Sequence, residues 1–214
     1  MQAEVLSHMT ATSTLTRKEA PKTGESVVTP ERYASGMSSF GEWMAFIEKN
    51  AETFQRHYDE FNPTPHDVEA LKRYVEDHGV KALLIGTDWC PDVWRGLPVA
   101  CRLSELSGME LRIFERDQNS DIMAEFLKDG EFESVPTIVL YDRDLNYLGH
   151  WIERADQANA EMAPLREIMA GKERGTPEWD TARAQYLEET WFLAEGWRQA
   201  QVHELLALLG EALG

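Results

Sequence analysis

Two cysteines, Cys90 and Cys101, are the residues of this 214-residue chain best suited to redox chemistry. Cys90 follows a short apolar run that ends at Gly86, and it begins a segment of helical periodicity that extends to Gly108. A sulfur at a helix N-terminus meets unpaired N–H groups and the positive end of the helix dipole, which stabilise a thiolate over a thiol. The carboxylate of Asp92 opposes this effect. We therefore expect Cys90 to be a moderately activated thiol with a lowered pKa.

Cys101 is not expected to form a disulfide with Cys90. Eleven residues along a helix span about 16 Å, whereas the Cα atoms of a disulfide lie about 4.4–6.8 Å apart. A kink at Pro98 would not close this gap without unwinding the helix. We interpret Cys101 as a core residue on the inner face of that helix.

The hydrophobic pattern predicts the elements that position Cys90. Short apolar runs bounded by turn residues are typical of buried strands, and four are expected, at 80–86, 111–114, 136–141 and 145–152. Helical periodicity is expected at 39–61, 65–78, 90–107, 122–127 and 156–170. From residue 80 the order is β-α-β-α-β-β-α, which predicts one parallel βαβ unit, a hairpin and a covering helix. We expect an α/β sandwich around a mixed sheet of about four strands.

The chain is expected to divide into four segments. Residues 1–36 are rich in Ser, Thr, Lys and Glu without a sustained apolar period, so we expect a flexible N-terminal arm. Residues 37–63 should form an N-terminal helical extension, residues 64–171 the α/β domain, and residues 172–214 a C-terminal helical extension. Gly196 is a candidate break between two C-terminal helices. These helices either pack on the body or a second subunit, or offer a groove to a partner.

Several motifs, in order along the chain, resemble those of the thioredoxin superfamily. Trp89-Cys90-Pro91-Asp92 resembles the thioredoxin motif Trp-Cys-x-x-Cys, and Pro98 matches the proline that kinks the active-site helix. Val135-Pro136-Thr137 resembles the turn whose cis-proline lies against the active-site sulfur, and Asp117-Gln118-Asn119 resembles a common strand-to-helix turn. The resemblance implies a thioredoxin-like three-layer sandwich with helical extensions at both ends.

Two positions depart from the thioredoxin pattern. Val93 stands where a thioredoxin has its second, resolving cysteine, and Leu84 stands where it has a buried acid that assists proton transfer to that thiol. Without a resolving thiol, a mixed disulfide must be released by an external one. The layout is also similar to a bacterial thioredoxin-like group of unassigned role with a Trp-Cys-x-Asp motif that often lacks the second cysteine.

We therefore expect a thiol–disulfide oxidoreductase that acts through Cys90 alone on a protein or small-molecule thiol or disulfide. The resemblance implies that the substrate meets Trp89, Pro91, Asp92, Val135, Pro136 and Thr137. The alternative is a non-catalytic binding or chaperone-like module with the same fold, and a third hypothesis is a dimer linked through Cys90. For Trp94, a role at the rim of the site and a role in the core remain equally open.

Composition narrows the possible partners. The 38 acidic and 21 basic side chains give a net charge of −17, which disfavours nucleic acid and anionic membrane surfaces. Neither a secretory signal nor a membrane span is visible, so we expect a cytoplasmic protein. The six histidines are scattered, and phosphate-binding glycine loops are absent, so no metal or cofactor is expected. A homodimer through the helical extensions is a further hypothesis.

Overall fold

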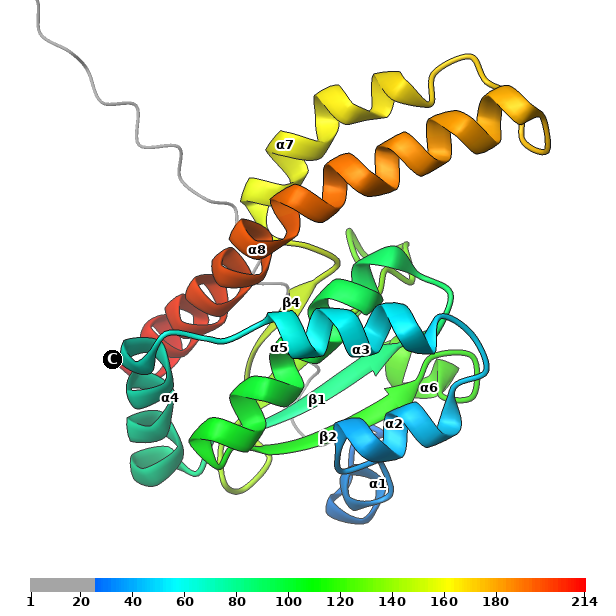
Figure 1. Cartoon of the computed structure of the whole chain (residues 1–214). Coiled ribbons are helices and arrows are strands. Elements are labelled where there is room, and N and C mark those ends of the chain that lie inside the picture. Colours follow the sequence, from blue (N-terminus) through cyan, green and yellow to red (C-terminus); the bar gives the residue numbers. More distant parts are fainter. Residues whose placement is uncertain (1–25) are drawn as a thin grey trace, which may run out of the picture.

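The computed structural model describes residues 26–214, which contain a mixed four-stranded sheet (Figure 1). Its strands are β1 (Lys81–Gly86), β2 (Glu110–Glu115), β3 (Thr137–Tyr141) and β4 (Tyr147–Ile152), in the order β2-β1-β3-β4. Strands β1 and β2 are parallel, whereas β3 is antiparallel to both β1 and β4. The expected βαβ unit followed by a hairpin is confirmed.

One face of the sheet carries the helix that begins after Cys90. This helix, α5 (Pro91–Ser107), contacts β1 and β2, and it also packs against α3 (Ala51–Glu60), α4 (Pro65–His78) and α8 (Pro177–Leu213). The start of α4 follows the sequence prediction, because the Thr64 side chain accepts a hydrogen bond from the backbone N–H of Asp67. These helices form one outer layer of the sandwich.

The opposite face is covered by α1 (Pro30–Ala34) and by the segment around α6 (Ser120–Met123). The Tyr33 hydroxyl of α1 donates towards the backbone carbonyls of Ala82 and Glu110, each 3.1 Å away, across the junction of β1 and β2. The expectation of a flexible arm up to residue 36 is therefore wrong for its last part, because α1 is anchored on the sheet. The rest of that arm, residues 1–25, lies outside the described residues.

The first amphipathic segment is two helices, not one. Helix α2 (Phe40–Phe46) ends at Ile47, whose backbone is extended, and α3 begins after Asn50. The Asp88 carboxylate accepts hydrogen bonds from the backbone N–H groups of Glu48 and Lys49, at 3.1 and 3.0 Å. The break is thus held by a residue two positions before Cys90, which the local apolar pattern could not indicate.

The C-terminal helices form a hairpin that projects beyond the sheet (Figure 1). Helix α7 (Asp156–Leu165) contains Pro164 and ends one residue later, where the chain continues into a 3-10 turn, Arg166–Ile168. Helix α8 is continuous over 37 residues, so Gly196 does not divide it. A glycine inside a helix costs only about 1 kcal/mol, which packing against α7, β4 and α5 can offset.

Candidate functional site

Cys90 occupies the N-cap position of α5, at the carboxyl end of β1. Its thiol is half-buried and lies 3.6 Å from the backbone carbonyl oxygen of Val135, to which it donates a weak hydrogen bond. The Val135–Pro136 peptide bond is cis, as the motif predicted. The structure thus brings together the two segments, 45 residues apart in sequence, that the sequence singled out.

The surroundings of Cys90 raise its pKa, so the expectation of a lowered pKa is wrong. Burial is the main cause, and the nearby Asp92 carboxylate adds to it. The backbone N–H groups of Val93 and Asp92 and the Arg95 guanidinium act in the opposite direction without reversing the result. The helix N-terminus therefore contributes as expected, but desolvation of the thiolate outweighs it. Cys90 is mainly a neutral thiol near pH 7.

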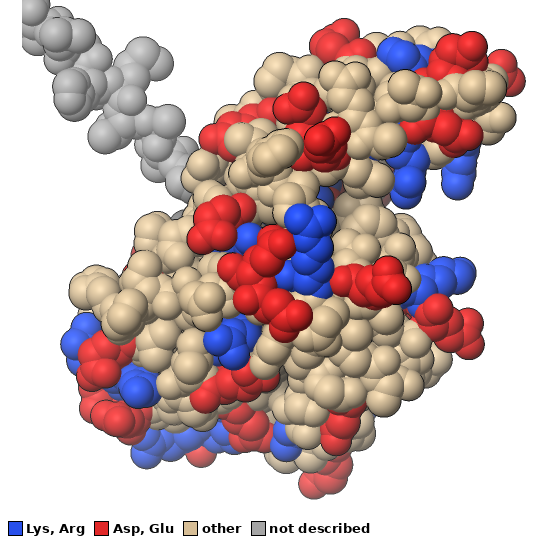
Figure 2. Space-filling model, in the orientation of Figure 1, with Lys and Arg blue, Asp and Glu red and all other residues tan. Residues whose placement is uncertain are grey.

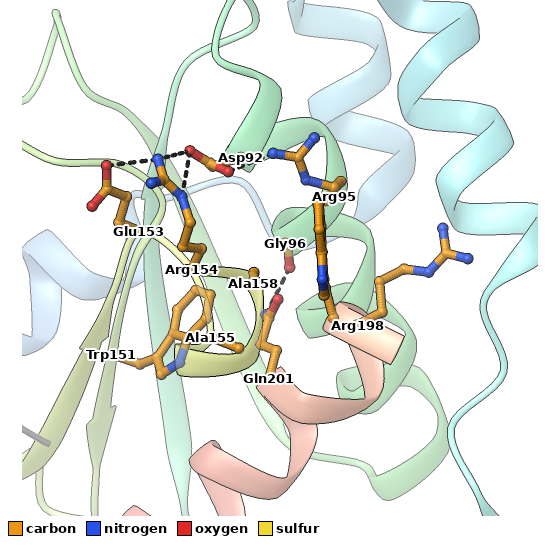
Figure 3. A pocket seen from close by; sticks show the side chains of 11 residues that line it. Asp92, Arg95, Gly96, Trp151, Glu153, Arg154, Ala155, Ala158, Arg198 and Gln201 are labelled. Carbon is orange, nitrogen blue, oxygen red and sulfur yellow. Dashed lines mark hydrogen bonds and ion pairs between the residues drawn. The ribbon is translucent and has the colours of Figure 1, made fainter. Parts of the chain in front are cut away.

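Asp92 points away from solvent and lies between two arginines (Figure 3). It is 8% exposed; its Oδ1 is 2.5 Å from Arg95 Nη2, and its Oδ2 is 2.5 Å from Arg154 Nη2. Arg154 also contacts Glu153 at 2.8 Å. Burial opposes the charged form of Arg154, but the hydrogen bonds and the charge of Asp92 raise its pKa above the usual value. The carboxylate is therefore a structural anchor between α5 and the residues after β4.

These arginines were missing from the sequence prediction. Arg95 lies three residues after Asp92, a spacing that places both on one face of a helix, so this pair had a local signal. Arg154 lies 62 residues after Asp92 and had none. The two guanidiniums keep the charge of Asp92 balanced within the fold.

Of the other predicted substrate-contacting residues, few reach the surface. Trp89 is 48% exposed and Pro91 is half-buried. Val135, Pro136 and Thr137 are buried, and the Thr137 hydroxyl donates a hydrogen bond to the backbone carbonyl of Ser134 at 2.8 Å. Trp89 is therefore the most exposed of the residues that the sequence assigned to this site.

A groove is lined in part by Trp89, the residue before Cys90, while Cys90 itself is not in its lining. It has a volume of about 430 Å³ and combines the exposed rings of Phe46 and Trp89 with several charged side chains. Its lining residues are Phe46, Ile47, Glu48, Lys49, Asp88, Trp89, Glu115, Asp117 and Gln118. Acidic side chains are also spread over the body and the projecting hairpin on the face shown in Figure 2. The groove offers an apolar contact surface with acidic edges.

Two further predictions concern residues on α5. Trp94 is buried, and its indole N–H donates to the backbone carbonyl of Asp88 at 2.8 Å, so packing is the role that the structure favours. Cys101 is 2% exposed, and burial raises its pKa, which confirms that it is a core residue. Both cysteines are free thiols. Val93, at the position of the missing thiol, is fully buried.

The described part of the chain lacks two other kinds of site. No three His, Cys, Asp or Glu side chains of residues 26–214 come together in a way that could hold a metal ion. None of the helices in the same range has the length and apolar composition needed to cross a bilayer.

A mixed sheet, a helix that starts at a cysteine and a cis-proline beside its sulfur define a protein of the thioredoxin-fold class. The sequence model of the family described as "Thioredoxin" matches residues 37–168, more than half of the chain. The chain therefore belongs to the thioredoxin family.

Two solved structures are similar in fold. One is a protein of unknown function from Pseudomonas aeruginosa, with a TM-score of 0.60 and 19% identity over 84% of this chain and 95% of that one. The other is an HIV epitope scaffold, with a TM-score of 0.59 and 19% identity over 85% of this chain and 97% of that one. No curated protein matches the sequence. These similarities establish the fold alone. The chemistry of the protein has to be inferred from the residues of the site.

Proposed function

We propose that this protein performs thiol–disulfide exchange through Cys90 alone. The observation that carries the proposal is the position of this thiol: it is half-buried at the start of α5, beside the carbonyl oxygen that precedes the cis-proline, with the exposed Trp89 next to it. Cys101 is fully enclosed and cannot take part. The substrate is a disulfide, or a thiol in the reverse direction, that approaches along the groove beside Trp89.

The exchange requires an external thiol to complete the cycle. The Cys90 thiolate attacks one sulfur of a substrate disulfide, forms a mixed disulfide and releases the other sulfur as a thiolate. Val93 cannot attack this intermediate. A second thiolate from solution then attacks the substrate sulfur, releases Cys90 as a thiolate, which regains its proton, and leaves the substrate in a new disulfide.

The raised pKa of Cys90 determines the kinetics that we expect. A small thiolate fraction slows attack at neutral pH, and a thiol of high pKa is also a poor leaving group. The mixed disulfide on Cys90 should therefore form slowly and persist. This behaviour suits capture of a partner that carries a disulfide better than rapid turnover.

A binding module without catalysis is the second candidate. The buried cis-proline turn and the raised pKa of Cys90 favour it, because both reduce access to a reactive thiolate. In that case the groove with Phe46 and Trp89 would hold a partner without covalent chemistry.

Intact-mass measurement with a neutral probe, 2-hydroxyethyl disulfide, separates the two candidates. Exchange predicts one mercaptoethanol adduct on the native chain, formed faster at pH 9 than at pH 7 and removed by added dithiothreitol. Cys90→Ser should form none, and Cys101→Ser, the matched control, should form the same single adduct. If the folded chain forms no adduct even at pH 9, the exchange proposal is wrong and the binding module remains.

A further inference from the structure

A second cavity lies between α3, the first turns of α5 and the middle of α8. Its volume of about 310 Å³ is at the lower end of the range for small-molecule sites, which is about 300–1,000 Å³. The lining residues are Glu52, Thr53, Arg56, His57, Trp94, Arg95, Leu187, Thr190 and Trp191. Cys90 and the cis-proline turn do not belong to this lining.

His57 supplies an unused hydrogen-bond donor to this cavity. Arg198 Nη1 lies 2.7 Å from His57 Nδ1, and because a guanidinium can only donate, Nδ1 is the acceptor and the ring proton is on Nε2. His57 is 2% exposed, and the contact with Arg198 leaves its Nε2–H as the ring donor that a ligand could use. Since His57 lines the cavity, this N–H is available to a bound ligand there.

The charges that act on His57 are positive. Burial first, and then Arg198, Arg95 and Arg56 in that order, lower the pKa of His57 to about 2, so the imidazole is neutral and its donor stays in place at physiological pH. Arg56 and Arg95 line the cavity, and Arg198 extends from α8 towards α3, away from the residues around Asp92 (Figure 3). A bound anion would meet the guanidiniums of Arg56 and Arg95.

These guanidiniums have acidic partners outside the cavity. Arg56 pairs with Glu60 at 2.8 Å, Arg95 with Asp92 at 2.5 Å, and Arg198 with Glu195 at 3.2 Å. Glu52 is the only acidic side chain in the lining, and it is exposed. Apart from Glu52, the charged side chains in the lining are therefore the basic Arg56 and Arg95.

Aromatic rings provide the remaining wall. The Trp191 ring stacks on His57 with a centroid distance of 4.3 Å, and Arg56 lies 3.6 Å from its centroid. Trp94 is held by its hydrogen bond to the Asp88 carbonyl, and Leu187 adds an aliphatic surface. His57 and Arg56 cover the faces of Trp191, so a ligand ring can meet the edge of Trp191 together with Trp94 and Leu187.

We propose that this cavity binds a small planar carboxylate. Its carboxylate accepts a hydrogen bond from His57 Nε2–H beside Arg56 and Arg95, and its apolar ring packs against Trp94 and Trp191. The site is distinct from the thiol site and does not depend on exchange at Cys90. Because Trp94 and Arg95 belong to the helix that starts after Cys90, a bound ligand would also stabilise the first turns of that helix.

Isothermal titration with two matched probes tests the proposal on the full chain. 1-Naphthoate carries the ring and the charge, and 1-naphthamide carries the ring alone. We expect 1-naphthoate to bind more tightly by about tenfold or more, since hydrogen bonds to a charged group are the stronger class. Equal affinities, or no binding of 1-naphthoate at millimolar concentration, would overturn the proposal.

Variants locate the bound probe. Arg56→Gln should weaken 1-naphthoate binding by about threefold to fivefold, because its guanidinium is partly exposed. Arg73→Gln removes the same charge from an exposed position on α4 and should change nothing. Cys90→Ser should also bind normally. Loss of binding in Cys90→Ser, or equal weakening by both arginine variants, would contradict the assignment.

A measurement on the native protein avoids changing the buried His57. Nitrogen–proton correlation spectra should show this ring as the neutral tautomer protonated at Nε2, and the Nε2–H signal should shift when 1-naphthoate binds. A ring protonated at Nδ1, or an unmoved Nε2–H signal at saturation, would refute the proposed contact.

Discussion

Replacing Asp92 with asparagine removes the negative charge between Arg95 and Arg154 and leaves the size of the side chain nearly unchanged. The carboxylate accepts from Arg95 Nη2 at 2.5 Å and from Arg154 Nε and Nη2 at 3.1 and 2.5 Å. Asparagine keeps one acceptor oxygen and turns the other into a donor, which cannot pair with a guanidinium. At least one arginine therefore loses its partner inside the fold.

The expected loss of stability follows from this geometry. Removing one partner of a buried ion pair costs about 3–5 kcal/mol. Arg154 keeps its contact with Glu153 at 2.8 Å, so we expect the lower end, about 3 kcal/mol. At about 2–4 °C per kcal/mol for a chain of this size, Asp92→Asn should lower Tm by about 6–12 °C.

The same substitution should lower the pKa of Cys90. The negative charge of Asp92 raises this pKa, whereas Arg95 lowers it. Asp92→Asn removes the first influence and keeps the second, so a larger fraction of the thiol should be ionised near neutral pH. The variant should thus be less stable and more reactive at once.

Alkylation rates measured against pH test this prediction. The rate of modification by iodoacetamide, measured in a Cys101→Ala background, gives the pKa of Cys90 directly. Asp59→Asn is a matched control, because Asp59 is exposed on α3 and its hydrogen bond from Gln55 lies within one helix turn. We expect no change in the pKa for this control and a change in Tm of no more than about 2 °C.

Two outcomes would refute the reasoning. An unchanged or raised pKa of Cys90 in folded Asp92→Asn would mean that Asp92 does not act on the thiol. An unchanged Tm would mean that the two arginine contacts do not contribute to stability.

Two further predictions concern stability. His57, with a pKa of about 2 against the ordinary 6.5, stays neutral in the fold while the unfolded chain takes up a proton below pH 6.5. The contribution of His57 to the free energy of unfolding is therefore present above pH 6.5 and is lost as the pH falls, by about 2.5 kcal/mol between pH 6 and pH 4. Urea unfolding of His57→Gln at several pH values should show a smaller dependence of this free energy on pH. A Cβ at Gly96 would lie 3.0 Å from Pro136 Cγ and 3.1 Å from Gln201 Oε1. Gly96→Ala should lower the free energy of unfolding in urea by about 1–3 kcal/mol. An unchanged midpoint of the urea transition would show that α8 can shift at this contact without loss of stability.

Much of the fold could be predicted from local patterns. The four strands are short apolar runs, and α4 begins at its Thr64 cap and ends at Gly79, which adopts the left-handed backbone conformation. These signals lie within a few residues of the feature that they specify. The position of Cys90 at the start of α5 and the cis-proline could be predicted for the same reason, because both belong to short motifs.

The break between α2 and α3 and the continuity of α8 could not be predicted from such patterns. Asp88 holds the break from 40 residues away, and packing against other elements keeps α8 intact through Gly196. The helix propensity of single residues is weaker than these tertiary contacts. The tertiary contacts therefore determine where these helices end.

The sequence by itself determined the fold class, the position of Cys90 at the start of its helix and the absence of a second cysteine at position 93, which is Val93. The tertiary structure alone decided the chemical state of the site. The pKa of Cys90 depends on burial, and Asp92 depends on Arg154, 62 residues away. The donor at His57 likewise depends on Arg198, 141 residues away. Desolvation and charge pairing act through space, so residues distant in the chain set the protonation of these groups.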